Sequence, residues 1–228
     1  MSWLSPALTI AGKDLRLEMK TRDVVASVGL FVLLVVVTAS FAFPTGGDGR
    51  EGVAAGVLWM AFLFAALLGM GRSMAIEKED ACLEGLLVSP APREAVFLGK
   101  LFTNLGFTFA VELVILPVFV ILLQLQPAGG ALLLILAAFL GTLGLVTVGT
   151  LFAAMAVNTR GREAILPLLV MPVSVPVMVA AVKVTEAGFS GTWTSGTTSW
   201  LLLMLGYDAL FLLVALPPRL SVTVRRAL

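Results

Sequence analysis

The sequence has no histidine and one cysteine among its 228 residues. Without histidine, no imidazole is available to coordinate a metal ion, to activate a serine or to relay protons. Cys82 alone cannot form a disulfide within the chain, and it leaves no cysteine cluster for a metal. These shortages count against an enzyme built on a nucleophile and a base, and we expect this chain to bind no cofactor of its own.

A phosphate-binding loop is also missing. The stretch "FLGKLF", residues 97–102, contains a Gly-Lys pair but lacks the upstream glycine and the following Ser or Thr of the G-x-x-x-x-G-K-[ST] pattern. The backbone cradle that holds nucleotide phosphates therefore cannot form here. Any ATP that this protein uses must be hydrolysed by another subunit, and we expect no nucleic-acid partner.

Apolar residues, in contrast, are abundant. They make up 59% of the chain, only 13% of residues are charged, and the mean hydropathy is +1.05. Apolar runs of about 20 residues are long enough to cross a bilayer as helices. The sequence predicts an all-α polytopic membrane protein with a single transmembrane domain over residues 1–228. Six spans are expected, at residues 24–43, 53–71, 101–123, 131–157, 164–182 and 199–216.

The basic residues predict the orientation of these spans. With the N-terminus inside, 13 of the 15 Lys and Arg residues fall on the cytoplasmic side, and only Arg50 and Lys183 fall outside. The positive-inside rule thus predicts that both termini are cytoplasmic. The first apolar run is longer than a usual signal-peptide core, so we expect it to remain as a span.

The leader, residues 1–23, has helical periodicity. Its apolar residues recur on one side of a helix and its basic residues on another, which is typical of a helix in the membrane interface. We expect an interfacial elbow helix before the first span; an amphipathic tail that packs on the bundle is the alternative. The apolar side contains Leu4, Leu8, Ala11, Leu15 and Met19.

Five charged residues lie together in "EKEDACLEGLL", residues 77–87, within the only large cytoplasmic loop, residues 72–100. On a helical wheel Glu77, Asp80 and Glu84 share one narrow face, and Leu83 and Leu87 lie beside it on the apolar side. The pattern predicts an amphipathic helix whose apolar face is docked. A merely solvated loop is the alternative.

Three stretches together resemble the CcmB family, the haem exporter protein B permeases of cytochrome c maturation. They are "EDACLEGLLVSPAPREAVFLGK" (residues 79–100), "GTLGLVTVGT" (141–150) and "NTRGREAILPLLVMPVSVPVM" (158–178). Each motif is weak, but their order, their spacing and the total length agree with the family over nearly the whole chain. Ala81 departs from it, because the family usually has Gly after the Asp.

The resemblance implies an ABC-2-type exporter-like membrane subunit in the bacterial inner membrane. The implied partners are a CcmA-like ATPase that binds ATP, a haem-handling CcmC-like subunit, a small CcmD-like subunit and a CcmE-like haem chaperone, with haem as the possible substrate of the complex. Residues 72–100 would then hold a coupling helix that meets the ATPase through Glu77, Asp80, Leu83, Glu84 and Leu87. Six spans are half the usual complement of an ABC transporter, so a homodimer is expected.

Two carboxyl groups, those of Glu112 and Asp208, fall near the middle of the membrane. Burying such a charge costs at least about 2.5 kcal/mol on insertion scales, so each should face protein or water or stay protonated. Hydrogen bonding between helices is one role for them. The other is substrate passage, which would suit a secondary transporter or channel. The small and hydroxyl residues of the fourth span offer partners: Gly141, Thr142, Gly144, Thr147 and Thr150.

The fifth span contains Pro167, Pro172 and Pro176. Each removes a backbone donor, so the span is either a kinked helix or a re-entrant hairpin closed by the outer loop "TWTSGTTSW". Trp193 and Trp200 of that loop, like Trp59, are expected to be interfacial anchors.

Overall fold

The computed structural model describes residues 4–20, 23–42, 50–79, 93–125, 130–156 and 162–215, and every regular element in them is a helix. This confirms the all-α fold class. The first half of the chain forms α1 (Leu4–Lys20), α2 (Asp23–Ala42) and α3 (Arg50–Glu79). The second half forms α5 (Arg93–Leu122), α6 (Ala131–Ala156), α7 (Arg162–Ser190) and α8 (Ser195–Ala215).

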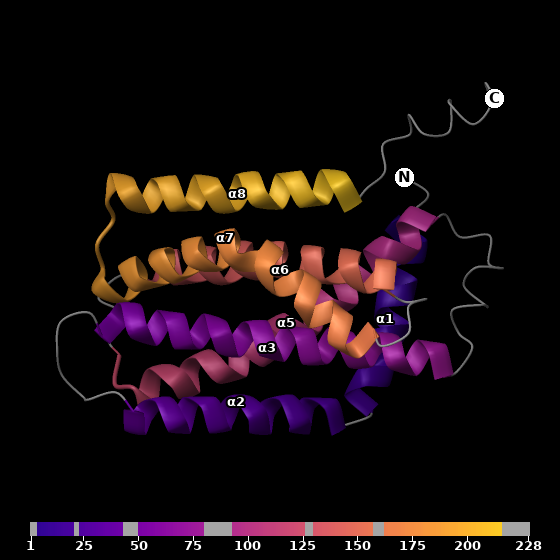
Figure 1. The fold of residues 1–228 in the computed structure, drawn as a ribbon, viewed down its shortest axis with the longest axis horizontal. Helices are drawn as coiled ribbons and strands as arrows, with labels where there is room; N and C mark the ends of the chain where they lie inside the picture. Colours follow the sequence, from indigo (N-terminus) through magenta and orange to yellow (C-terminus); the bar gives the residue numbers. More distant parts are fainter. Residues whose placement is uncertain are drawn as a thin grey trace.

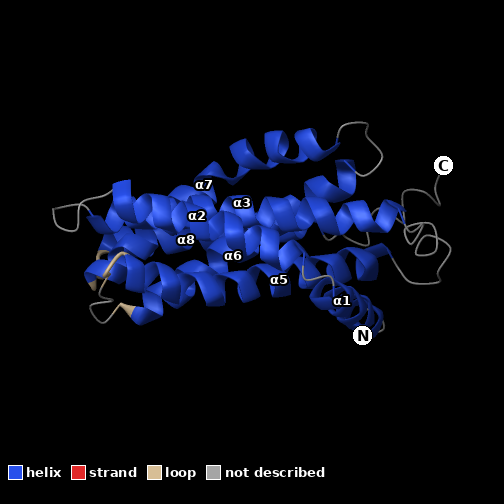
Figure 2. Ribbon diagram, turned by 90° about the horizontal axis from the view of Figure 1, so that it is seen from below, coloured by secondary structure: helices blue, strands red, loops and turns tan. Residues whose placement is uncertain are grey.

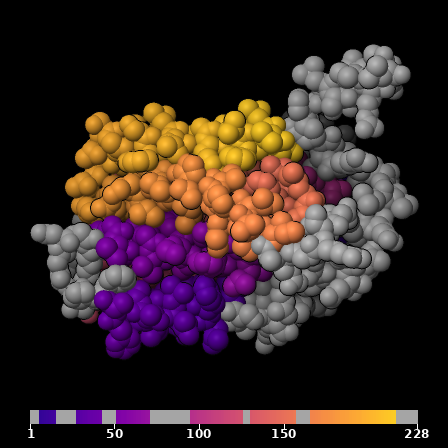
Figure 3. Space-filling model, viewed as in Figure 1, coloured from indigo at the N-terminus to yellow at the C-terminus, as the bar shows by residue number. Residues whose placement is uncertain are grey.

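The six helices from α2 to α8 lie side by side and alternate in direction, and α1 crosses one end of the bundle (Figures 1 and 2). Figure 1 shows that α3 ends, α5 begins and α8 ends at the end where α1 lies, which we call the α1 end. The space-filling view shows α8, α7, α3 and α2 as successive bands across one face (Figure 3).

Within the described residues, five helices are long and apolar enough to cross a membrane: α3, α5, α6, α7 and α8. The 20 residues of α2 would span about 30 Å at 1.5 Å per residue, which equals the hydrocarbon thickness of a bilayer. The described apolar segment within α2, Val28–Ala42, is shorter than these five. The polytopic fold is thus confirmed with five spans, and α2 as the remaining span stays a prediction.

The centre of the bundle is α6, which packs against α3, α5, α7 and α8. Glycines allow these close approaches. A Cβ atom added at Gly141 would overlap the ring of Trp59 on α3, and one at Gly149 would overlap the side chain of Met70. The small residues of the fourth predicted span therefore serve helix packing.

The elements differ from the sequence-based bounds in three places. The helix of the second span continues to Glu79, and the third begins at Arg93 rather than at residue 101, so both extend into the predicted loop 72–100. The last helix begins at Ser195, so the expected outer loop shrinks to residues 191–194 and Trp200 lies within α8. Hydrogen bonds among Thr194, Thr197 and Thr198 stabilise this helix start.

The proline-rich fifth span is one continuous helix, α7, with all three prolines inside it. The ribbon bends along its length, as expected where proline removes backbone hydrogen bonds (Figure 1). The re-entrant alternative is therefore wrong, because Arg162–Ser190 crosses the bundle once.

The interfacial position expected for Trp59 is also wrong. Its side chain is 1% exposed, and its indole N–H donates a hydrogen bond to Oγ1 of Thr185 on α7 at 2.9 Å. That bond satisfies the one polar group that would otherwise keep the ring near water. Trp193, by contrast, is largely exposed.

The leader forms the helix α1, as expected. Ala7 is buried and α1 packs against α5, whereas Leu8, assigned to the apolar side, is 61% exposed. A Cβ atom at Gly99 of α5 would clash with Ile10, so close contact between the two helices depends on that glycine. The position of α1 in a membrane interface stays a prediction.

Candidate functional site

A row of four polar residues follows one face of α5. Lys100, Asn104, Thr108 and Glu112 are spaced four residues apart, which places them on one side of the helix, and all four are buried. We call them the α5 polar row. It begins near the α1 end and extends to the middle of the span Ala95–Leu122.

The first member of the row pairs with α1. The Lys100 ammonium lies 2.5 Å from a carboxylate oxygen of Asp14, and the two side chains are only 7% and 8% exposed. Lys13, which is about half exposed, approaches the other Asp14 oxygen at 3.2 Å. A buried charge of either sign is costly unless it is paired, so this contact fixes α1 against the first turns of α5.

The next two members are satisfied within the bundle. The Asn104 amide donates to Oγ1 of Thr150 on α6 at 3.0 Å, and the Thr108 hydroxyl donates to the Asn104 carbonyl at 2.8 Å. Polar groups that lack water must find such partners in protein. The α5 polar row therefore connects α5 to both α1 and α6.

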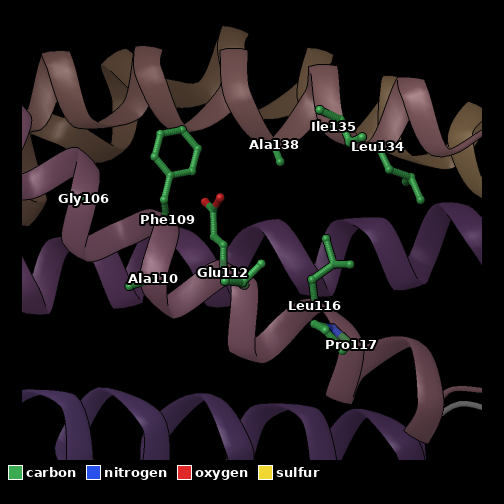
Figure 4. Close-up of a pocket in the computed structure, with 10 residues that line it drawn as sticks. Gly106, Phe109, Ala110, Glu112, Leu116, Pro117, Leu134, Ile135 and Ala138 are labelled. Atoms are coloured by element: carbon green, nitrogen blue, oxygen red, sulfur yellow. The ribbon is translucent and has the colours of Figure 1, made fainter.

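The last member, Glu112, is 4% exposed and accepts a hydrogen bond from the Thr142 hydroxyl of α6 through Oε1. Its Oε2 atom has no hydrogen-bond partner among the described residues. Figure 4 shows the carboxyl group extending from α5 toward α6, between Phe109 and Ala138. Glu112 also lines an open groove of about 570 Å³ between α5 and α6, whose other lining residues are apolar.

Asp208 on α8 occupies a different place. It is 3% exposed, neither carboxyl oxygen has a hydrogen-bond partner within the described ranges, and the group lies directly against Gly144 of α6. The neighbouring Tyr207 hydroxyl donates to the Val173 carbonyl at 2.9 Å and so joins α8 to α7.

The structure does not bring the two carboxyl groups into one site. Glu112 contacts Thr142, whereas Asp208 contacts Gly144. Two residues along a helix turn through about 200°, so these contacts lie on opposite sides of α6. The two carboxyl groups therefore contact α6 from different sides.

Comparison with known proteins identifies the family. The family model described as "CcmB protein" matches residues 6–224. The chain belongs to the CcmB family. The resemblance read from the three sequence stretches is thereby confirmed.

Several curated relatives of this CcmB-family chain are named Heme exporter protein B. The protein of Rhodobacter capsulatus is 32% identical over 182 residues, covering 80% of this chain and 83% of the relative. The Paracoccus denitrificans protein is 30% identical over 179 residues, covering 78% and 82%. That of Pseudomonas aeruginosa is 28% identical over 172 residues, covering 75% and 77%.

The residues expected to form the coupling surface are only partly described. In this CcmB-family chain Glu77 lies near the end of α3, beyond the span that ends at Met70. Asp80, Leu83, Glu84 and Leu87 lie outside the described residues. Their contact with an ATPase stays a prediction from sequence.

Sequence reasoning missed the Asp14–Lys100 pair and the Asn104–Thr150 hydrogen bond. Lys100 lies at the end of the predicted cytoplasmic loop 72–100, because the apolar run of the third span starts after it. The missed signal was the spacing: polar residues at 100, 104, 108 and 112 recur every four positions, which is the period of one helix face.

Proposed function

We propose that this protein is the membrane-spanning subunit of an ABC-type transporter complex for cytochrome c maturation. It couples ATP hydrolysis by a separate ATPase to haem export or to release of a haem-loaded chaperone. The observation that carries the proposal is the family match over residues 6–224, together with relatives named Heme exporter protein B. The chain itself contributes no catalytic group in this proposal.

The connection of the predicted coupling segment, residues 80–92, to the bundle supports the proposal. Residues 71–79 of α3 continue past Met70 by about 13 Å at 1.5 Å per residue, and α5 starts at Arg93, both at the α1 end. A displacement of residues 80–92 would therefore act on two helices of the bundle at once. Helix α5 would pass it to α1 through the Lys100–Asp14 pair.

The proposed complex contains a CcmA-like ATPase, a CcmC-like haem-handling subunit, a CcmD-like small subunit and a CcmE-like haem chaperone. We place this subunit in the bacterial inner membrane with the α1 end and both termini in the cytoplasm, as the distribution of Lys and Arg predicts. Two copies form the working membrane unit. Cross-linking that finds one copy beside two ATPases would contradict the two-copy arrangement, unless another permease supplies the other half.

Charge reversal tests the coupling surface. Glu84→Lys and Asp80→Lys place a positive charge on the acidic edge, the face formed by Glu77, Asp80 and Glu84 that is expected to meet the ATPase. They should weaken ATPase retention or uncouple hydrolysis while membrane insertion is unchanged. Leu83→Asp should instead disturb docking of the segment on its own bundle. The measurements are the amount of ATPase that copurifies and ATP-dependent cytochrome c maturation in cells.

The control is Glu51→Lys in the first turn of α3, at the opposite end of the bundle. It makes the same charge change, Glu to Lys, without touching the predicted coupling segment. If Glu84→Lys and Asp80→Lys match this control in both assays, the acidic edge is not the coupling surface. If no ATPase copurifies with the unmodified protein under any condition, the ABC assignment itself fails.

A further inference from the structure

The groove between α5 and α6 combines an apolar lining with one incompletely bonded carboxyl group. Thr142 occupies Oε1 of Glu112, and Oε2 is buried without a partner among the described residues. In water such an atom would be hydrated, but an unsatisfied polar atom at membrane depth costs free energy. The unsatisfied oxygen therefore favours an occupant of the groove that can hydrogen-bond to Glu112.

The position and shape of the groove restrict this occupant. Two lining residues, Leu113 and Ile135, are among the most exposed side chains, and we call them the rim of the groove. The groove therefore opens to the outside of the bundle at membrane depth. Gly106, Ala110 and Ala138 contribute little bulk to the lining. Small residues of this kind allow another helix to approach closely in a membrane.

The unpaired oxygen discriminates among the candidates. A lipid acyl chain fills an apolar groove but forms no hydrogen bond with a carboxyl group. A second copy that docked groove to groove would set two Glu112 side chains against each other, each already held by Thr142. A transmembrane helix with a hydroxyl, amide or amine group satisfies both the apolar lining and the carboxyl group.

We propose that the α5–α6 groove binds a transmembrane helix of another subunit of the complex, and that a polar side chain of this helix hydrogen-bonds to Glu112. In this proposal Glu112, which lines the groove, changes rotamer on docking so that its buried Oε2 faces the partner helix. The groove is thus an assembly surface at mid-membrane, separate from the coupling segment at the α1 end. The inference rests on the proposed membership in a multi-subunit complex.

Site-specific photo-cross-linking in the intact complex tests this inference. A photoreactive amino acid replaces Leu113 or Ile135 at the rim, and Leu202 serves as the control because it is equally exposed to the outside but belongs to α8. We expect both rim positions to give an adduct with an integral membrane subunit, and Leu202 to give none with that subunit. Mass spectrometry should place the cross-link in a transmembrane segment with a hydrogen-bonding residue, and changing that residue to Leu should reduce the adduct at least fivefold.

Variants of Glu112 separate docking from simple stability. Glu112→Leu should lose most of the adduct, whereas Glu112→Gln, which still hydrogen-bonds, should keep it. Thr142→Val is the matched control, since it removes the bond inside the chain but leaves the carboxyl group for the partner. If Thr142→Val loses the adduct as fully as Glu112→Leu, the loss reflects α5–α6 packing and the inference is overturned.

The other products also decide the matter. An adduct of two copies of this chain, adducts with lipid alone, or an adduct that is unaffected by Glu112→Leu would each overturn the inference. ATPase retention is measured in the same preparations. A preparation that retains the ATPase but lacks the rim adduct refutes the groove and leaves the proposed function standing; loss of the ATPase from the unmodified complex refutes the proposed function instead.

Discussion

Breaking the Asp14–Lys100 pair should destabilise the protein far more than breaking a surface pair. The two side chains are almost completely buried and lie 2.5 Å apart. Removing one partner of a buried ion pair costs about 3–5 kcal/mol, because the other charge stays buried without its counter-charge. Lys100→Met should fall at the lower end of that range because Asp14 keeps Lys13 at 3.2 Å. Asp14→Leu, which removes the carboxylate that both Lys100 and Lys13 approach, should fall within the same range.

The double variant Asp14→Leu/Lys100→Met removes both charges. It should be more stable than either single variant, because well-packed apolar residues can replace a buried pair at little cost. The free energy of unfolding is measured in mixed micelles titrated with a denaturing detergent and followed by helical circular dichroism. The control is Lys183→Met with Glu186→Gln, a partly exposed pair at 2.8 Å that should contribute only about 0–1 kcal/mol.

Additivity would refute this reasoning. If the loss in the double variant equals the sum of the single losses to within about 0.5 kcal/mol, the two side chains act independently. The assignment of Lys100 and Asp14 as the contact that fixes α1 to α5 would then be wrong. A loss below about 1 kcal/mol in both single variants would lead to the same conclusion.

Two further predictions concern topology and packing. In a cysteine-free background, a cysteine at Ala91 should react with a membrane-impermeant reagent only from the cytoplasmic side and one at Ser195 only from outside; the reverse pattern would overturn the orientation. Gly141→Ala should destabilise the bundle by about 1–3 kcal/mol because its Cβ overlaps Trp59, whereas Gly56→Ala, which meets no atom within 4 Å, should cause no loss; equal thermal stability of the two variants would contradict the packing argument.

The helices of this fold could be predicted because a bilayer allows few alternatives. A chain that crosses hydrocarbon must satisfy its backbone internally over about 20 apolar residues, so long apolar runs identify spans directly. The ends were less predictable, because helices continue beyond the hydrocarbon wherever polar residues such as Glu77 tolerate helical geometry. The kink of α7 followed from its prolines, but proline alone does not separate a bent helix from a hairpin.

The interior of the bundle could not be predicted by the same means. In a membrane protein, apolar side chains cover both the core and the lipid-facing surface, so hydropathy does not tell which face of a helix is buried. Trp59 illustrates this: its ring suits the interface, yet a partner for its N–H, Thr185, lies 126 positions away in sequence. Polar residues inside spans are better guides, since each must contact protein, as Glu112 and Asn104 do.

Helix α5 is the element on which these observations converge. Its first turns follow the predicted coupling segment, Lys100 pairs with α1, and Asn104 and Glu112 bond to two threonines of α6, the central helix. A helix held at three heights by polar contacts cannot slide along its neighbours without breaking them, because each group would be left unsatisfied in an apolar medium. A displacement that enters at Arg93 must therefore move α5 together with α1 and α6, or break the polar row. The proposed partner helix would bond to Glu112, the last residue of the α5 polar row. A movement of α5 would therefore displace the partner helix although it does not contact the α1 end.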